Sequence, residues 1–421
     1  MTHIDYDVAI VGASIAGTTC AKLMARQGLK VLMIDRKRSS SDFKMVCTTF
    51  IQRSALPVIH KLGLKERLEA EGAIRNNAEF WTEYGWIRDS GARESGMEHG
   101  YSIRREILDP ILMSMVAEEP NVTTVLGSTL SGLNRDSEDL IRGIEWQDRA
   151  GLTHSASASL VVLADGRNSA GAKMAEVPTR YRNNNRFVYF CYYKDMPLKT
   201  GEVAQFWQVG KDMRFAYPFD EGLTMLCSFV TQDKYAEWAK DKRGRLEDSF
   251  RDLPDSPDQS RAQPVSKVRG MRKMNDYRRP AAFRGLALVG DACMSCDPMS
   301  GVGCGFAFQS ADWLASEVTP FVGKPGQAAA LEKYRHKHRH MLAGHEYFIQ
   351  DASTDRLPNL LEKAISRAAV QDPEVARRLH RFVARVTRWT EFLTPGTVGR
   401  IILANIAYGR ASKRRHVDAH G

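Results

Sequence analysis

The sequence predicts an α/β fold with three parts: a Rossmann-like dinucleotide-binding domain, an inserted antiparallel sheet and a helical C-terminal region. Two separated strand–glycine-turn–helix segments, one at the N-terminus and one near residue 290, predict the first part. Aromatic-rich runs between them predict the sheet, and helical patterns fill the chain after residue 326. With 421 residues, 43% of them hydrophobic, the chain is large enough to bury two or three packed lobes.

The N-terminus has the pattern of a dinucleotide-binding βαβ unit. An apolar run typical of a buried parallel strand leads directly into the glycine turn Gly12–Gly17. A helix and a second apolar strand follow, and Asp35 lies 18 residues after Gly17, near the usual spacing of about 20. Ser14 replaces the middle glycine, but its small side chain still allows a pyrophosphate to approach. The predicted elements are a strand at Tyr6–Val11, a helix at Thr18–Gln27 and a strand at Lys30–Ile34. The predicted cofactor contacts are Gly12, Ser14, Ile15, Ala16, Gly17, Asp35 and Arg36.

A second cofactor segment, Gly290–Ala315, begins where the short apolar strand Leu286–Val289 ends. It contains an irregular loop rich in proline and glycine, and then a helix begins. Backbone N–H groups and the helix dipole favour a ligand at such a place, and the glycines let a large planar ring approach the main chain. Asp291 can accept a hydroxyl from a ribose or ribityl chain. We therefore expect a flavin here, in contact with Asp291, Pro298, Gly301, Val302, Gly303 and Cys304.

The middle of the chain changes character. Its aromatic, β-rich runs predict an antiparallel sheet with one face turned towards a pocket, and a polar helix at Ala236–Leu253 outside it. Arg214 could bind an acidic or phenolate group, whereas most strand aromatics belong to a core. The predicted strands are Phe187–Tyr193, Val203–Val209, Met213–Phe219 and Leu223–Val230. The candidate substrate contacts are Phe206, Trp207, Arg214, Phe215 and Tyr217.

The remaining elements complete a four-part organisation. We expect the flavin domain over residues 1–180 and 281–325, the substrate sheet over 181–280 and a helical region over 326–421. The first part contains a helical excursion and a small hairpin, predicted at Gln52–Glu71, Val122–Leu133 and Leu140–Asp148. The C-terminal helices are predicted at Ala328–Gln350, Leu357–Val370, Pro373–Phe392 and Thr397–Lys413.

Three separated motifs resemble, in order, those of the p-hydroxybenzoate-hydroxylase-like flavoprotein superfamily, which includes aromatic hydroxylases, epoxidases, geranylgeranyl reductases and flavin halogenases. They are Gly12–Gly17 with Asp35-Arg36, Leu160–Ser169 with its Asp165-Gly166 step, and Gly290–Gly303. The segment Tyr101–Asp109 is also similar to the one whose arginine, here Arg105, reaches the flavin. The resemblance implies FAD in a glutathione-reductase-type domain, with adenine over the N-terminal unit, the flavin ring at the Pro298 loop and Asp165 near both flavin and reductant.

The resemblance further implies an FAD-dependent monooxygenase. Such an enzyme takes electrons from NAD(P)H, forms a flavin C4a-hydroperoxide with O2, and inserts one oxygen atom into an aromatic or polyunsaturated substrate. Loop Pro298–Gly305 would offer backbone N–H groups to the flavin. No second dinucleotide fingerprint is visible, so NAD(P)H binds transiently or a separate flavin reductase supplies the electrons. No catalytic acid or base is identified.

Alternative functions remain open within the same superfamily. The stretch Asp297–Gly303 is closer to the loop of geranylgeranyl reductases, which reduce C=C bonds, and Cys293 departs from the hydroxylase pattern. The segment Lys44–Cys47 resembles the cysteine loop of those reductases, with Thr48 in place of their glycine, which makes Cys47 a candidate cofactor contact. Halogenation is disfavoured because Met213–Pro218 lacks the tryptophans of tryptophan-type halogenases. A redox-silent flavoprotein is a further alternative.

Composition limits the partners. The formal net charge is +10, with basic clusters at Arg335–His340 and Lys413–Arg415, but no nucleic-acid-binding motif accompanies the charge. Weak contact with a membrane surface is compatible with it. No apolar run approaches the about 20 residues that span a bilayer, and no signal segment is visible, so we expect a cytoplasmic protein. The odd number of cysteines, seven, predicts reduced thiols, with the pair Cys293 and Cys296 packed near the flavin. No metal site is expected, because no carboxylate spacing supports the histidines at His336–His345.

Overall fold

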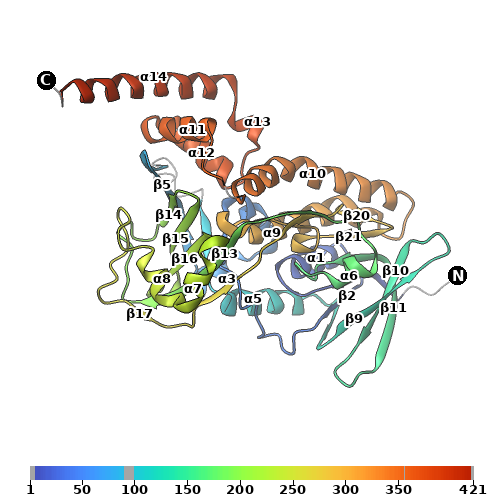
Figure 1. Ribbon diagram of the computed structural model, residues 1–421. Coiled ribbons are helices and arrows are strands. Elements are labelled where there is room, and N and C mark those ends of the chain that lie inside the picture. The colour runs from blue at the N-terminus through green and yellow to red at the C-terminus, as the bar shows by residue number, and fades with distance from the viewer. Residues whose placement is uncertain (1–4, 90–98, 355, 419–421) are drawn as a thin grey trace.

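The computed structural model describes residues 5–89, 99–354 and 356–418 (Figure 1). A mostly parallel sheet with helices beside it lies next to a second, antiparallel sheet, and the C-terminal helices lie along one side of both. The structure thus has the α/β fold class that the sequence predicts.

The first sheet forms around the N-terminal strand. Its order is β20-β21-β11-β1-β2-β8, and every pair from β21 to β8 is parallel. Such strands are covered on both faces, which is why β1, β2 and the end of β11 are continuous apolar runs. The strands are β1 (Tyr6–Val11), β2 (Val31–Asp35), β8 (Val122–Leu126), β11 (Thr153–Leu163), β20 (Ala282–Phe283) and β21 (Leu286–Leu288).

Helices and a hairpin complete this domain. Helix α1 (Ile15–Ala25) follows β1, helix α9 (Val302–Val318) follows the second cofactor segment, and the two pack against each other. Helix α1 begins three residues earlier than predicted, so the end of the glycine turn lies in its first turn. The hairpin consists of β9 (Thr129–Arg135) and β10 (Ile141–Gln147), whereas β8, predicted as part of it, belongs to the parallel sheet. Smaller helices are α2 (Leu56–Leu62), α3 (Lys65–Ala70), α5 (Arg105–Ala117) and α6 (Ala170–Met174).

The second sheet has the order β17-β13-β16-β15-β14-β5-β6, with β18 beside β13. Strand β5 pairs in parallel with β14, so residues 78–87 belong to this sheet, although we placed them in the flavin domain. The predicted helix Ala236–Leu253 is two helices, separated at Asp241, whose side chain accepts the Gly244 N–H. The strands are β5 (Ala78–Thr82), β6 (Gly85–Ile87), β13 (Arg186–Lys194), β14 (Ala204–Val209), β15 (Asp212–Pro218), β16 (Thr224–Thr231), β17 (Gln263–Pro264) and β18 (Arg269–Met271). The helices on its outer face are α7 (Tyr235–Lys240) and α8 (Lys242–Asp248).

Two three-stranded sheets join the larger units. One pairs β3 (Phe50–Ile51), β7 (Gly100–Ser102) and β4 (Ile74–Asn76), and the other pairs β12 (Arg180–Arg182), β19 (Asp276–Arg278) and β22 (Met294–Ser295).

The C-terminal region is helical, as predicted, and α11 and α14 pack together at one edge of the molecule (Figure 1). One predicted helix, Pro373–Phe392, is broken, because Arg385 has a φ of 60° in the left-handed region. The helices are α10 (Gln327–Ala352), α11 (Leu360–Gln371), α12 (Pro373–Val383), α13 (Trp389–Phe392) and α14 (Pro395–Asp418). Among the described residues, no helix is both long and apolar enough to cross a membrane.

Candidate flavin site and adjoining pocket

The glycine turn after β1 is closed so tightly that only glycine fits at two of its positions. A Cβ on Gly12, whose φ is 109°, would lie 2.4 Å from the carbonyl oxygen of Ala164. A Cβ on Gly17 would lie 1.8 Å from the carbonyl oxygen of Gly12. Ser14 is the N-cap of α1, and its side chain accepts no capping hydrogen bond from that helix. The N–H groups of the first turn, which includes Ile15 and Ala16, are therefore presented beside the end of β1, where an anion is favoured.

Asp35, at the end of β2, lies against this turn. Its Oδ2 accepts the Ala13 N–H at 2.5 Å, and its Oδ1 accepts the Lys37 N–H at 2.7 Å. The Lys37 Nζ donates to the carbonyl oxygen of Ala13 at 3.0 Å, whereas Arg36 is exposed. A carboxylate has about four acceptor positions, so Asp35 can still accept the hydroxyls of a ribose.

Arg105, the first residue of α5, reaches the same turn. Its Nη2 donates to the Ser14 Oγ at 2.7 Å, and its Nε donates to the Asp109 Oδ1 at 2.8 Å. Asp109 also accepts the Lys44 N–H at 2.9 Å and lies 3.6 Å from the Lys37 Nζ. Sequence reasoning missed the roles of Lys37 and Asp109, although the spacing of four residues between Arg105 and Asp109 on a helix is a readable signal.

Two further carboxylates, Asp165 and Asp291, follow the carboxyl ends of β11 and β21, and we call the site that they form with the glycine turn and the start of α9 the groove. The Asp165 Oδ2 accepts the Gly171 N–H at 3.0 Å, while its Oδ1 is buried without a hydrogen-bond partner. Burial raises the pKa of Asp165. Asp291 lies 3.5 Å from the Lys44 Nζ, and its main-chain oxygen accepts the Tyr277 hydroxyl at 2.6 Å. An orphaned buried oxygen such as that of Asp165 is an acceptor that a hydroxyl-rich ligand would satisfy.

The loop before α9 is a short 3-10 turn that starts at Pro298. The Asp297 side chain accepts the Met299 N–H at 2.8 Å, and Gly301 then adopts a φ of 63°. Gly303 is exposed in the first turn of α9, and the nearest atom to a Cβ built there is the Asp291 Oδ1, at 4.0 Å. Its neighbours Val302 and Cys304 are buried. A planar ring can therefore approach the main chain at Gly303, as predicted for the flavin.

Cys47 lies beside this helix start. It belongs to the loop between β2 and β3, and its Sγ is 4.0 Å from the Cys304 Sγ. The structure thus brings the predicted contacts on α1, α5 and α9, the loop cysteine, Asp35 and Asp291 to one groove.

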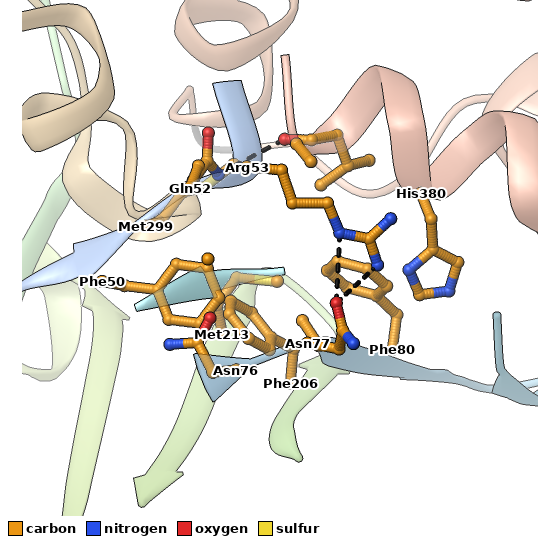
Figure 2. A pocket seen from close by; sticks show the side chains of 14 residues that line it. Phe50, Gln52, Arg53, Asn76, Asn77, Phe80, Phe206, Met213, Met299 and His380 are labelled. Carbon is orange, nitrogen blue, oxygen red and sulfur yellow. Dashed lines mark hydrogen bonds between the residues drawn. The ribbon is translucent and has the colours of Figure 1, made fainter. Parts of the chain in front are cut away.

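A cavity of about 200 Å³ adjoins the Pro298 loop (Figure 2). Met299 and Phe50 contribute to its wall, and a Cβ on Gly301 would touch Phe50 at 3.0 Å, so the cavity and the loop are continuous. Strands of the second sheet form one side, and α12 forms another. Its apolar wall is formed mainly by Phe50, Phe80, Phe206, Met213 and Met299, and its polar wall by Gln52, Arg53, Asn76, Asn77 and His380.

The polar wall is organised around Arg53. Its Nε and Nη2 donate to the Asn77 Oδ1 at 3.1 and 2.8 Å (Figure 2). Its Nη1 lies 3.4 Å from Asp89. Burial lowers the pKa of His380 to about 4, so its imidazole is neutral at pH 7. The Asn76 Nδ2 donates to the Ser102 Oγ at 2.5 Å, and the Asn76 Oδ1 is buried without a partner. No sequence motif marks these residues, because they come from separate elements.

The structure does not bring two of the candidate substrate contacts to this cavity. Trp207 and Arg214 pair across β14 and β15 on the opposite face of the sheet, because successive strand residues alternate between faces. The Trp207 Nε1 donates to the Pro254 carbonyl at 2.9 Å, and Arg214 donates to Asp212 at 3.2 Å.

The other candidates from this sheet lie on the face that borders the cavity, but Phe215 and Tyr217, which we expected as substrate contacts, do not line it. Phe206 lines the cavity, while Phe215 and Tyr217 lie behind it in the same cluster, each 0% exposed. The Tyr217 hydroxyl is buried without a hydrogen-bond partner. These two residues therefore shape the pocket from behind. Among the described residues, no group of three His, Cys, Asp or Glu side chains could hold a metal ion.

Comparison with known proteins identifies the family. Residues 5–346 match the FAD binding domain family. The chain belongs to this family. The match covers β1, the glycine turn, the second sheet and most of α10, and it confirms the superfamily predicted from the motifs.

Relatives of this FAD binding domain protein include several kinds of flavoenzyme. It is 26% identical to tryptophan 2-halogenase of Chondromyces crocatus over 78% of this chain, and spans only 64% of that protein's length. It is 21% identical to digeranylgeranylglycerophospholipid reductase of Thermoplasma acidophilum, over 90% of this chain and 99% of the relative. It is 25% identical to squalene monooxygenase of Mus musculus, over 71% of this chain and 52% of the relative.

Solved structures confirm the fold. The flavin-dependent brominase Bmp2 superposes with a TM-score of 0.74 at 17% identity, over 97% of this chain and 99% of that one. The p-nitrophenol 4-monooxygenase PnpA from Pseudomonas putida DLL-E4 gives a TM-score of 0.74 at 15% identity, over 92% and 100%. At the level of the family, these comparisons agree with the prediction of an FAD-dependent oxidoreductase.

The groove fits FAD on its own geometry. It has two helix N-termini, a turn that needs glycine at Gly12 and Gly17, an open main chain at Gly303, and acceptors in Asp35, Asp165 and Asp291 for hydroxyls. These are the donor and acceptor types that a dinucleotide with a polyhydroxylated chain requires.

Proposed function

We propose that the protein is an FAD-dependent monooxygenase that inserts one oxygen atom from O2 into an apolar or aromatic organic substrate, with electrons from NAD(P)H. The observation that supports it best is the apolar pocket that continues directly from the Pro298 loop and the start of α9. A substrate in that pocket lies next to the place where the helix and loop would hold a flavin ring. Relatives named as monooxygenases or hydroxylases, such as squalene monooxygenase, agree with this proposal.

The roles of the chain's own residues follow from the groove. We assign the pyrophosphate to the N-terminus of α1 near Ser14 and Arg105, the adenosine ribose to Asp35, and the ring to the segment from Pro298 to Gly303. Bound FAD would supply the electron-transfer and oxygen chemistry. Arg105 and Lys37 place positive charge by the phosphates, although Asp109 offsets part of it.

The substrate class can be narrowed from the pocket. The phenylalanines and methionines of its wall, together with the limited volume, favour a substrate with a flat or flexible apolar body. The buried, unpartnered Asn76 Oδ1 favours a substrate with a hydroxyl or N–H donor, because that donor would satisfy it. The neutral His380 adds no charge at pH 7, so a fully ionic substrate would gain little from it.

A C=C reductase of the geranylgeranyl type is the second candidate. Two observations favour it: the resemblance of Asp297–Gly303 to the reductase loop, and the Thermoplasma acidophilum relative, which matches over 90% of this chain. In that case the pocket would hold an isoprenoid chain, and no oxygen would enter the product.

Isotopically labelled O2 separates the candidates. The purified protein would be incubated with FAD, NADPH and a panel of phenols, aromatic acids, indoles and polyisoprenoids, and the products analysed by mass spectrometry. A monooxygenase gives a product with one labelled oxygen atom. A product with two added hydrogens and no label would instead establish the reductase, and bound FAD with no turnover of any compound would favour the redox-silent alternative. Replacing NADPH by NADH, or adding a separate flavin reductase, tests which electron donor reduces the bound FAD.

A further part of the proposal concerns where the protein works. Residues 356–421 contain 13 Lys and Arg but only five Asp and Glu, a formal net charge of +8 out of +10 for the whole chain. Apolar side chains are exposed on the outer face of α14 and at the start of α11: Ile402, Leu403, Ile406, Leu360 and Leu361. We define these five residues as the α11–α14 surface. Apolar groups among basic residues are typical of contact with an anionic membrane surface, and α12, which lines the pocket, contacts both helices.

A further inference from the structure

Two cysteines from distant parts of the chain meet at the groove, and the proposed reaction uses neither of them. Cys47 lies in the loop between β2 and β3, and Cys304 lies in the first turn of α9, 257 residues later. Their Sγ atoms are 4.0 Å apart. Cys47 is partly exposed as a residue, whereas Cys304 is buried.

The surroundings favour a thiolate at this pair. Arg105 and Lys44 place positive charge near Cys47. A hydrogen bond from the Cys304 thiol, helped by these two cations, holds the pKa of Cys47 well below its usual range against the effect of burial. The same hydrogen bond and burial raise the pKa of Cys304. Asp109 and Asp291 pair with Arg105 and Lys44 and offset part of that positive charge. Two phenols, Tyr192 and Tyr217, also lie near Cys47, and burial raises their pKa values, so they stay neutral at pH 7. One thiolate and one adjacent thiol are the two partners that disulfide formation needs.

We propose that Cys47 and Cys304 form a peroxide-sensitive dithiol site, in which Cys47 is oxidised and Cys304 resolves the product as a disulfide. The Cys47 thiolate attacks one oxygen of hydrogen peroxide, the O–O bond breaks, and sulfenic acid and hydroxide form. The Cys304 sulfur then attacks the sulfenic sulfur. Its proton and the sulfenic hydroxyl leave as water, and both electrons of the oxidation come from the two cysteines. This chemistry does not depend on which reaction the flavin site catalyses.

The other cysteines lack these features. Cys293 and Cys296, despite their CxxC spacing, are both buried, and burial raises the pKa of Cys293 to about 12 and that of Cys296 well above its usual value. A protonated, enclosed thiol reacts slowly with peroxide. Cys296 therefore serves as a matched control close to the same loop.

Disulfide formation would change the groove. The Sγ atoms must close from 4.0 Å to about 2.05 Å, which draws the Cys47 loop towards the start of α9. The same loop contains Lys44, whose Nζ lies 3.5 Å from Asp291. We therefore expect the oxidised apoprotein to take up FAD more slowly than the reduced one, and a dithiol reductant to reverse the effect.

Non-reducing peptide mapping tests the site. The full-length protein, with FAD bound and after FAD removal, would be treated with one equivalent of hydrogen peroxide, alkylated, digested and analysed by mass spectrometry. The expected result is a Cys47–Cys304 peptide that has lost two hydrogens, with two of the seven thiols lost per chain. In Cys304→Ser, dimedone should label Cys47 as sulfenic acid. Cys296→Ser should still form the Cys47–Cys304 disulfide.

Some results would overturn the proposal. It fails if Cys47 and Cys304 both remain alkylatable, with FAD bound and without it, when the peroxide has been consumed. It also fails if oxidation is spread equally over the buried cysteines, because the paired geometry would then confer no selectivity. Circular dichroism of each variant checks that the fold is intact. Dimedone labelling of Cys304 in a Cys47→Ser variant would show that peroxide oxidises Cys304 directly, which contradicts the proposed order.

Discussion

The turn leaves no space for a side chain at Gly17, so a substitution there tests directly whether FAD binds at this turn. The missing Cβ of Gly17 would lie 1.8 Å from the carbonyl oxygen of Gly12, so Gly17→Ala must push α1 away from the turn. The N–H groups assigned to the pyrophosphate would move with the helix. We expect FAD bound per chain to fall from near one to near zero, measured from the visible flavin absorbance of the purified protein.

The matched control is Gly399→Ala on α14, where nothing lies within 4 Å of the new Cβ. That variant should keep its FAD. Because Gly17→Ala could also weaken the fold, its circular dichroism and thermal midpoint belong to the same experiment. A well-folded Gly17→Ala protein with full FAD content would show that the pyrophosphate lies elsewhere.

Buried histidines make stability depend on pH. Burial, and secondarily the charge of Arg278, lowers the pKa of His338 from 6.5 to about 3. Below pH 6.5 the unfolded chain binds a proton that the folded chain does not, so stability is lost as the pH falls from about 6.5 towards 3. One such group gives a slope of at most about 1.4 kcal/mol per pH unit.

We therefore expect the thermal midpoint to fall between pH 7 and pH 5, and to fall less steeply in His338→Gln. His336→Gln, on the same helix but with 77% of its side chain exposed, should leave the slope unchanged. Equal slopes in all three proteins would mean that His338 is not the group responsible.

At the residue scale, the sequence predicted the positions of residues that belong to a short strand–turn–helix motif. Gly12, Gly17, Asp35 and Asp291 lie where expected because strand, turn and helix follow one another within a few residues. Arg53 and Asn76 could not be predicted as pocket residues. They come from separate elements, and only the three-dimensional packing brings them to one wall.

At the scale of elements, one face of the second sheet borders the cavity and the other packs against α7 and α8. Met213 lines the cavity from β15, so Met213→Trp should fill part of its volume without disturbing the flavin groove. We expect a KM raised at least about tenfold for whichever panel compound is turned over, since losing one apolar subsite is worth about 1–3 kcal/mol. The bound FAD should remain unchanged. Val209→Trp, at the exposed end of the neighbouring strand, is the control.

An unchanged KM in Met213→Trp would place the substrate outside this cavity. Trp207 and Arg214 were expected at the pocket, but they lie on the opposite face of the sheet, because successive residues of a strand alternate between its two faces. Aromatic content marks a strand, but only the pairing of β14 with β15 shows which residues share a face. That residues 78–87 join this sheet could not be predicted either, because β5 pairs with a strand more than 120 residues later in the chain.

At the scale of the whole molecule, charge and exposed apolar surface coincide at the C-terminal end. The α11–α14 surface includes Leu360 at 85% exposure and Leu403 at 68%, on helices whose opposite sides pack against each other through Ala368 and Ile401. The side chains of the predicted basic cluster Lys413–Arg415 lie outside the described residues. Their charge nevertheless counts in the formal +8 of this region.

We expect the full-length protein to bind vesicles of phosphatidylcholine with phosphatidylserine, and to bind pure phosphatidylcholine vesicles much less. Basic residues near an anionic surface contribute about 1 kcal/mol each, and high salt weakens them. Replacing Ile402, Leu403 and Ile406 together by serine should reduce co-sedimentation with anionic vesicles, while the thermal midpoint stays unchanged because all three are exposed. Leu152→Ser, 62% exposed on the β10–β11 turn at the other end of the molecule (Figure 1), is the control and should still bind. If the triple variant co-sediments as well as the unaltered protein, charge alone explains the binding. If a triple variant changes only the apparent size of the free protein, the α11–α14 surface instead joins two copies of the chain.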